Sequence, residues 1–124
     1  MSKVSDNFNR NEFRCSCSMD CGHIAVDIVL LNTLEKIRKH FNKPVKINSA
    51  NRCREHNASV GSKDTSQHVR GTAADIVVRD TDVQSVYDYA CQIMPNHGGI
   101  GIYDTFVHID SREGLARWDK RNII

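Results

Sequence analysis

The sequence lacks any long apolar run, since its longest aliphatic stretch, residues 28–31, is far too short to span a bilayer. It has only two prolines and no repeat, low-complexity tract or Pro/Gly/Ser-rich linker, so nothing divides it into separate domains. It also lacks an excess of one charge, because 17 Lys and Arg stand against 15 Asp and Glu. Without a basic or aromatic stripe, it does not resemble a nucleic-acid binder. We predict one domain, 1–124, with neither a membrane nor a nucleic acid as its partner.

A secretion signal is missing too. Residues 1–8 contain no apolar run of signal-peptide length, which predicts a protein that is made in the cytoplasm and stays there. In that reducing compartment, cysteines serve more often as thiols or metal ligands than as disulfide bridges. The chain does have five Cys and six His in 124 residues. Such a surplus of soft ligands points to a metal.

Hydrophobic periodicity predicts an α+β fold. Apolar residues recur every three or four positions in segment 26–41, and the nearly continuous apolar segment 73–78 indicates a strand buried on both faces. Thr81 and Gln84 are spaced as a capping box. The predicted elements are a helix over 26–41, a strand over 45–47, a short helix over 54–60, a strand over 73–78, a helix over 81–93 and a hairpin of strands 100–103 and 106–110. We expect the helices to pack on a small, mainly antiparallel sheet.

Asp75 is the first candidate for a metal ligand. It lies in a strand that otherwise holds only apolar residues, and a buried carboxylate without a partner costs several kcal/mol. A metal ion shared with His68, in the preceding polar loop, would be such a partner. The alternative is that Asp75 accepts backbone hydrogen bonds and that His68 is a surface residue.

His108 strengthens the case for a metal. The two-residue period of a strand places His108 and Asp110 on one face of segment 106–110, with apolar residues on the other. His68, Asp75 and His108 together form a three-ligand set that suits Zn²⁺ and leaves a fourth position for water. Zinc lowers the pKa of bound water to about 7, which is the chemistry of a hydrolase.

These residues carry a resemblance. The segment Ser66-x-His68-x-x-Gly71-x-Ala73-x-Asp75 resembles the Ser-x-His-x-x-Gly-x-Ala-x-Asp motif of the M15 family of zinc D-Ala-D-Ala peptidases. Further similar segments follow the family's order along nearly the whole chain. They are residues 49–52, 55–57, 99–103, 106–110 and 117–118, together with residues 7–15, which resemble small phage-type members.

The resemblance implies a fold of the hedgehog/D-Ala-D-Ala peptidase type and a zinc peptidase whose partner is the peptidoglycan stem peptide. Its activity would be that of an L-Ala-D-Glu endopeptidase or a D-Ala-D-Ala carboxypeptidase. His68, Asp75 and His108 become the zinc ligands. Arg52 becomes the cation that holds a substrate oxygen and stabilises the oxyanion. The alternative for Arg52 is a surface salt bridge.

The general base is where the sequence departs from the family. Several branches place an acid three residues before the last His ligand, and here that position holds Thr105. Asp104 precedes it in a predicted turn and has the alternative of a simple turn residue. Asp110 shares the face of His108 and is our first choice for the base, with orientation of a ligand as its alternative.

The cysteines have a separate interpretation. Cys15, Cys17 and Cys21 form a compact N-terminal cluster in segment 1–25, which we expect to pack on the domain. With Cys53 they would bind a second, structural Zn²⁺, or they would form disulfides or remain free thiols. Cys91, on the apolar side of the second helix, is predicted to be a small buried residue.

The predicted setting is that of a phage endolysin. We expect a monomer that waits in the host cytoplasm and acts on the cell wall after the membrane is opened. The rival interpretation is a non-catalytic zinc module of the same fold in a virion or in signalling, which the absence of an acid at Thr105 supports.

Overall fold

The computed structural model describes residues 5–13, 27–50 and 72–121. Its five strands form one sheet in the order β1-β2-β4-β3-β5. Neighbouring strands are antiparallel except β3 and β5, which are parallel. The predicted α+β class with a mainly antiparallel sheet is confirmed. The elements are η1 (Arg10–Phe13), α1 (Ile28–Phe41), β1 (Val45–Ser49), β2 (Ala73–Val78), α4 (Val83–Ile93), β3 (Gly98–Ile102), β4 (Val107–Asp110) and β5 (Leu115–Asp119).

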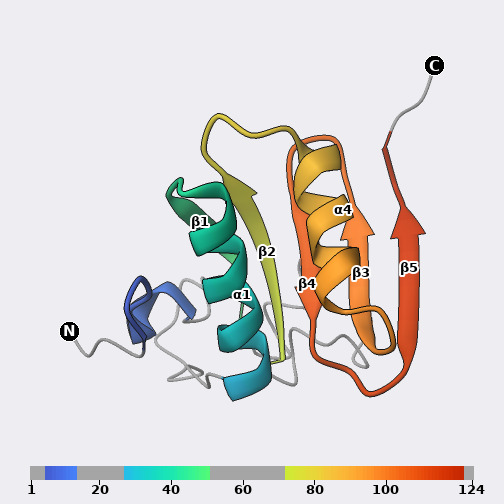
Figure 1. The fold of residues 1–124 in the computed structure, drawn as a ribbon, viewed down its shortest axis with the longest axis horizontal. Helices are drawn as coiled ribbons and strands as arrows, with labels where there is room; N and C mark the ends of the chain where they lie inside the picture. The colour runs from blue at the N-terminus through green and yellow to red at the C-terminus, as the bar shows by residue number, and fades with distance from the viewer. Residues whose placement is uncertain (1–4, 14–26, 51–71, 122–124) are drawn as a thin grey trace, which may run out of the picture.

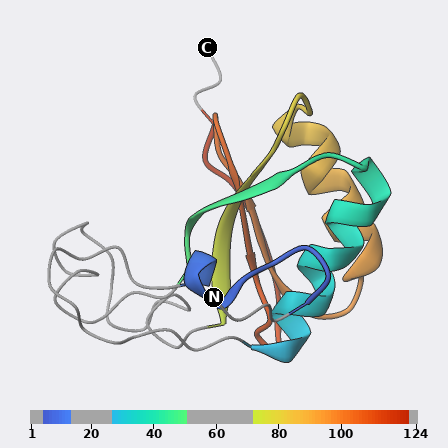
Figure 2. The ribbon, with the colours of Figure 1, turned by 90° about the vertical axis from the view of Figure 1, so that its left-hand side faces the viewer.

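The molecule has two layers. Figure 1 shows α1 and α4 side by side in front of the sheet, and Figure 2 shows that both lie on the same face of it. The core lies between the layers, where buried residues of α1 meet those of β2 and β4, such as Leu34, Ile76 and Ile109. The opposite face of the sheet is therefore left for side chains that do not belong to this core.

Both helices begin at an aspartate. The Asp27 carboxylate accepts the backbone N–H of Leu30 at 2.9 Å and caps α1. The Asp82 carboxylate caps α4 by accepting the N–H of Ser85 at 3.2 Å. The predicted capping box at Thr81 is wrong, because the Thr81 hydroxyl donates to the carbonyl of Arg79 in the preceding turn.

Most of the predicted strands agree with the structure. The strand over 73–78 is confirmed as β2, and the predicted hairpin forms as β3 and β4. The strand over 45–47 extends to Ser49 as β1. β2 is not fully buried on both faces, because Asp75 and Val77 face away from the core and are half-buried. The predicted short helix over 54–60 lies outside the described residues.

The segment before α1 is held by aromatic packing and by Glu35. Phe8 and Phe13 are each 1 % exposed and belong to the core cluster. Glu35 of α1 is buried and accepts two hydrogen bonds from Asn7, one from the backbone N and one from Nδ2, both at 2.7 Å. Residues 5–13 therefore contribute to the same core as the helices and the sheet.

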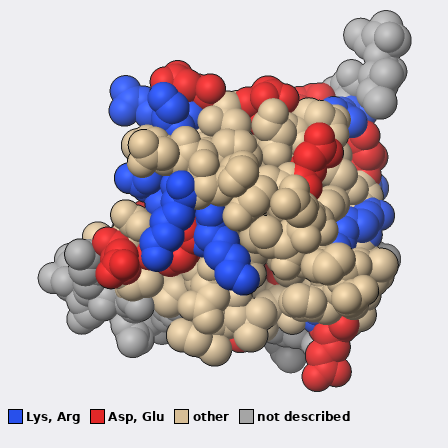
Figure 3. Space-filling view, in the orientation of Figure 1, with Lys and Arg blue, Asp and Glu red and all other residues tan. Residues whose placement is uncertain are grey.

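The outer surface of α1 is charged. Figure 3 shows Lys and Arg gathered over the part of this face where α1 lies, with acidic side chains among them. The last turn of α1 supplies Arg38, Lys39 and His40, which suit the negative end of a helix dipole. Among the described residues, no helix is long and apolar enough to cross a membrane.

Candidate metal centre

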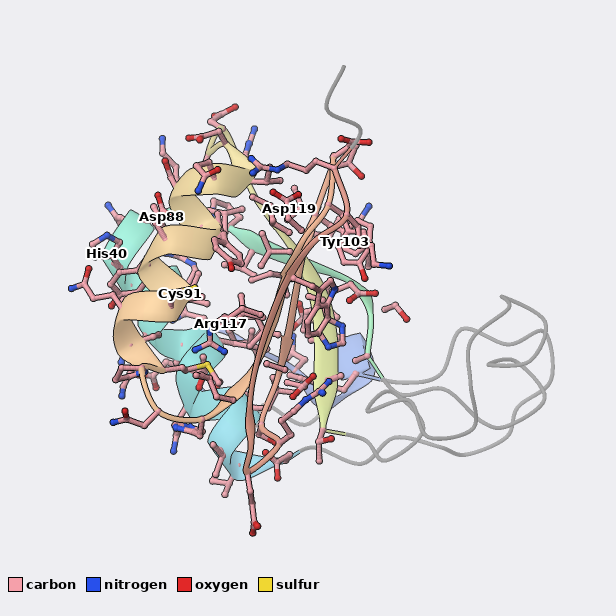
Figure 4. All side chains as sticks on the ribbon, turned by 90° about the vertical axis from the view of Figure 1, so that its right-hand side faces the viewer. His40, Asp88, Cys91, Tyr103, Arg117 and Asp119 are labelled. Carbon is pink, nitrogen blue, oxygen red and sulfur yellow. The ribbon has the colours of Figure 1, made fainter. Side chains whose placement is uncertain are left out.

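Asp75 and His108 lie opposite each other on neighbouring strands. The antiparallel pairing of β2 with β4 sets Asp75 beside His108 in register. Val107 and Ile109 belong to the core, so strand alternation turns His108 to the other face of the sheet. In Figure 4 Tyr103 lies on this face, whereas His40, Asp88 and Cys91 lie on the helix side. The predicted division of β4 into a core face and a polar face is confirmed.

The imidazole of His108 is held between two carboxylates. Its Nδ1 lies 3.0 Å from Oδ1 of Asp75, and its Nε2 lies 2.8 Å from Oδ2 of Asp110. Burial works to lower the pKa of His108, but hydrogen bonds and charge from Asp110 and Asp75 outweigh it and raise this pKa. The ring therefore has a fixed orientation, with one nitrogen toward each acid.

Asp110 is the most enclosed of these groups, since its side chain is 0 % exposed. Its Oδ1 accepts from the backbone N–H of Gly99 at 2.9 Å and from the backbone N and Nε of Arg112 at 3.2 and 2.8 Å. Its Oδ2 accepts from Nη2 of Arg112 at 2.7 Å. Burial works to raise the pKa of Asp110, but hydrogen bonds from His108 and Arg112 hold it well below its usual range. Of the two roles that the sequence left open, these contacts favour orienting His108 over accepting a proton.

Two glycines of β3 leave room for these side chains. A Cβ at Gly99 would lie 2.3 Å from Oδ2 of Asp110, and a Cβ at Gly101 would lie 2.2 Å from Nε1 of Trp118. The pairing registers place Gly101 between His108 and Trp118 in one row across the sheet. A larger residue at either position would displace a side chain of the site.

Aromatic residues flank His108 on the same face. The rings of Trp118 and His108 are tilted, with their centroids 5.1 Å apart, and the guanidinium carbon of Arg112 lies 5.5 Å from the Trp118 ring centroid. The indole Nε1 donates to the Tyr103 hydroxyl at 3.0 Å, and the Tyr103 ring stacks on Phe106. β5 thus brings Trp118 beside the candidate centre, and Tyr103 and Phe106, from the connection between β3 and β4, extend this aromatic row.

The Asp75 and His108 pair fits a zinc ion. Two ligands of a tetrahedral zinc lie roughly 3.3 Å apart, because each zinc bond is about 2.0–2.1 Å long. The observed separation of 3.0 Å is close to this value. Contact of Nε2 with a carboxylate is also the usual arrangement of a zinc-bound histidine. Within the described residues, no group of three or more His, Cys, Asp or Glu side chains is placed to hold a metal. The predicted third ligand, His68, lies outside these residues.

The other predicted site residues divide into two groups. Asp104 lies in the exposed turn between β3 and β4. The sequence predicted this turn, and a simple turn residue was the alternative to a catalytic role for Asp104. Cys91 is a free thiol, half-buried and packed against the core rather than fully enclosed. The remaining predicted residues lie outside the described part of the chain: Arg52, Cys15, Cys17, Cys21 and Cys53.

The sequence predicted no role in the site for Arg112, and it included Gly99 and Gly101 only as part of segment 99–103. Gly101 within the predicted strand 100–103, with Gly99 just before it, was a usable signal, since glycine in a strand often marks a close approach of other groups. The sequence contained no comparable signal for Arg112, because its contact with Asp110 depends on the turn that follows β4.

One comparison with known proteins gives a match. A family model described as Peptidase M15 matches residues 6–110, a range that includes Asp75, His108 and Asp110. No curated protein matches the chain. Because the matched range covers well over half of the 124 residues, the chain belongs to the peptidase M15 family.

Proposed function

We propose that the protein is a zinc-dependent peptidase that hydrolyses an amide bond of the peptidoglycan stem peptide. The observation that carries this proposal is the opposition of Asp75 and His108 at a zinc-compatible distance inside the segment that matches the peptidase family. The bond is that of an L-Ala-D-Glu endopeptidase or a D-Ala-D-Ala carboxypeptidase. The setting that we propose is a phage endolysin made in the host cytoplasm, which the resemblance of residues 7–15 to small phage-type members supports.

Asp75, His108 and His68 would hold the metal. When bound, zinc acts as a Lewis acid that polarises the scissile carbonyl and lowers the pKa of water, so that a hydroxide-like nucleophile is available at neutral pH. Oδ1 of Asp75 and Nδ1 of His108 face each other and are the donor atoms on the described strands. Asp110 keeps the His108 ring in place through Nε2.

The chain also has to stabilise the oxyanion and to move a proton. We propose Arg52 for the first task, because a guanidinium beside developing negative charge is worth a few kcal/mol in a dry site. Replacing Arg52 with Ala should lower turnover and leave zinc content intact. Two described residues are candidates for the group that moves the proton, Asp110 and Asp104. Asp110 is the weaker of the two, because both of its oxygens already accept hydrogen bonds.

The test is release of stem peptides from purified peptidoglycan, with and without a chelator. The variant His108→Gln should lose about 100-fold or more of this activity, because it removes a metal ligand. The matched control is His40→Gln, whose imidazole stacks on Tyr89 on the helix side of the sheet. Stem-peptide release at the full rate in the presence of chelator would overturn the proposal.

Mass spectrometry of the products distinguishes the two bonds. Hydrolysis of the terminal bond releases free D-alanine, whereas endopeptidase action releases a peptide that begins with D-glutamate. A zinc-to-protein ratio of two instead of one would support the second, structural site at the N-terminal cysteines.

One observation favours a second candidate, a non-catalytic zinc module of the same fold. Thr105 stands where several branches of the family place an acid, and the nearest enclosed acid, Asp110, is fully engaged. Stoichiometric zinc binding without any release of stem peptides would identify the protein as such a module.

A further inference from the structure

A continuous chain of contacts links Arg112 to the candidate metal centre. Nε and Nη2 of Arg112 hold the two oxygens of Asp110, and Oδ2 of Asp110 contacts Nε2 of His108. Nδ1 of the same ring faces Asp75. We propose that Arg112 is a positioning residue, which acts through Asp110 to keep the proton of His108 on Nε2 and to present Nδ1 to the metal. This inference rests on the proposed zinc site.

Arg112 fixes the orientation of the Asp110 carboxylate. A guanidinium that binds both oxygens sets the plane of the carboxylate, which a single donor cannot do. The backbone N–H groups of Gly99 and Arg112 add two more donors to Oδ1. With Oδ1 occupied in this way, Oδ2 is the oxygen that remains for the histidine.

The hydrogen bond between His108 and Asp110 runs in one direction. An ionised carboxylate is only an acceptor, so the 2.8 Å contact with Oδ2 requires His108 to donate from Nε2. In a neutral ring the lone pair then lies on Nδ1, which is 3.0 Å from another carboxylate oxygen, that of Asp75. Two acceptors at that distance need a proton or a metal ion between them, and in the metal-free protein an imidazolium proton on Nδ1 can fill this place. Because Nε2 keeps its proton for Asp110, Nδ1 is the nitrogen that can exchange its proton for the metal.

The pair of Asp110 and Arg112 differs from an ordinary salt bridge. A second pair, Asp119 and Arg121, has the same spacing and the same two-point contact, with Nε on Oδ1 and Nη2 on Oδ2. No histidine contacts it among the described residues. Asp119 and Arg121 are therefore a natural control for Asp110 and Arg112. Arg112 lies beyond residues 6–110, so the match to the family model does not include it.

The experiment measures zinc affinity by competition with a chromophoric chelator, together with the visible spectrum of the Co²⁺-substituted protein. We expect Arg112→Met to bind zinc about 10-fold more weakly than the wild type, the lower end of the effect of removing a group that contacts a ligand directly, because Arg112 acts through Asp110. Arg112→Lys should lose less, because one ammonium still contacts one oxygen. Arg121→Met should leave the affinity and the Co²⁺ spectrum unchanged.

A folded Arg112→Met protein with wild-type zinc affinity and an unchanged Co²⁺ spectrum would overturn the inference, because a purely structural salt bridge predicts that result. A second measurement needs no variant. Long-range ¹H–¹⁵N correlation spectra of the metal-free wild type should show a proton on Nε2 of His108, and a neutral ring protonated only on Nδ1 would also overturn it. If the wild type binds no zinc, the proposed function fails, while the Nε2 measurement still tests the role of Arg112.

Discussion

Two aspartate-arginine pairs with identical spacing lie at the ends of two strands, and their surroundings differ. Asp110 is the last residue of β4 and Asp119 is the last residue of β5, and Arg112 and Arg121 lie two residues further along the chain. The two arginine side chains are similarly exposed, at 34 % and 28 %, but the carboxylates are not, at 0 % for Asp110 and 40 % for Asp119. Figure 4 shows Asp119 near the end of β5. The same local sequence pattern thus produces one enclosed pair and one exposed pair.

The partners of the carboxylate, and not the arginine contact itself, decide what such a pair does. Asp110 also binds Gly99 and His108, so its position is transmitted to the candidate metal centre. Arg121 also donates from Nη1 to Gln84 of α4, so the second pair links β5 to a helix. A buried charge that loses its partner is costly, whereas an exposed pair is screened by water.

The largest effect should come from Arg112→Met. This change leaves the enclosed Asp110 carboxylate without its guanidinium partner, and breaking a buried pair costs about 3 kcal/mol at the lower end of the usual range. The lower end applies because the Arg112 side chain is one-third exposed. Urea denaturation at neutral pH measures the free energy of unfolding. A loss no greater than that of Arg121→Met would contradict the contrast between the two pairs.

The next effect should come from Gly99→Ala. A Cβ at this position would lie 2.3 Å from Oδ2 of Asp110 and 2.7 Å from Nε of Arg112. Because those atoms are held by each other, the added methyl group must shift both, and we expect a loss of about 2 kcal/mol in the free energy of unfolding. The matched control is Gly114→Ala, where a Cβ would meet nothing within 4 Å.

Thermal unfolding compares the two glycine variants directly. Gly99→Ala should melt at a lower temperature and bind zinc more weakly, while Gly114→Ala should behave as the wild type does. Equal melting temperatures for the two variants would show that the space around Asp110 is less restricted than the distances indicate.

The sequence was sufficient to predict that His108 and Asp110 share a face. The two-residue period of a strand decides this, and the apolar Val107 and Ile109 show which face meets the core. The pattern of β2 likewise isolated Asp75 as the one acid in an apolar strand. Both predictions depend on neighbours in the sequence, which is why they agree with the structure.

The sequence was not sufficient to predict how Asp110 would be used. Its role depends on the register that pairs it with Gly99 and on the turn that returns Arg112 to it. The parallel addition of β5 beside β3, which brings Trp118 to the site, depends on a similar long-range pairing. No local period encodes such contacts, so they become visible only when the strands are placed side by side.

A third carboxylate, that of Glu35, accepts its hydrogen bonds from an uncharged residue instead of an arginine. Glu35 is buried like Asp110, but its oxygens accept from the backbone N and Nδ2 of Asn7. Burial works to raise the pKa of Glu35, but the hydrogen bonds from Asn7 outweigh it and lower this pKa. Because the pKa is lower in the folded chain, the stabilisation is complete above the unfolded value of 4.5 and is lost as the pH falls through the folded value.

The variant Glu35→Gln should therefore lose about 1 kcal/mol of the free energy of unfolding at neutral pH, because one hydrogen bond to Asn7 is lost. Below the folded-state pKa of Glu35, the difference from the wild type should shrink. The control is Asp6→Asn, since the Asp6 side chain is 86 % exposed and its ion pair with Lys39 is 4.0 Å long. A difference that stays constant as the solution is acidified would contradict the lowered pKa of Glu35.

The smallest effect should come from Arg121→Met. Water screens both members of the Asp119 and Arg121 pair, and Asp119 needs no internal partner, because water replaces the lost donors. We expect the free energy of unfolding to remain within the error of urea denaturation, both in dilute buffer and in high salt. Because Arg121 also bonds Gln84, a clear loss in both solutions would show that the link between β5 and α4 matters more than the ion pair. A loss of unfolding free energy in dilute buffer that disappears in high salt would instead show that the exposed ion pair is itself stabilising. The exposure of the Asp119 carboxylate would then not explain why this pair differs from Asp110 and Arg112.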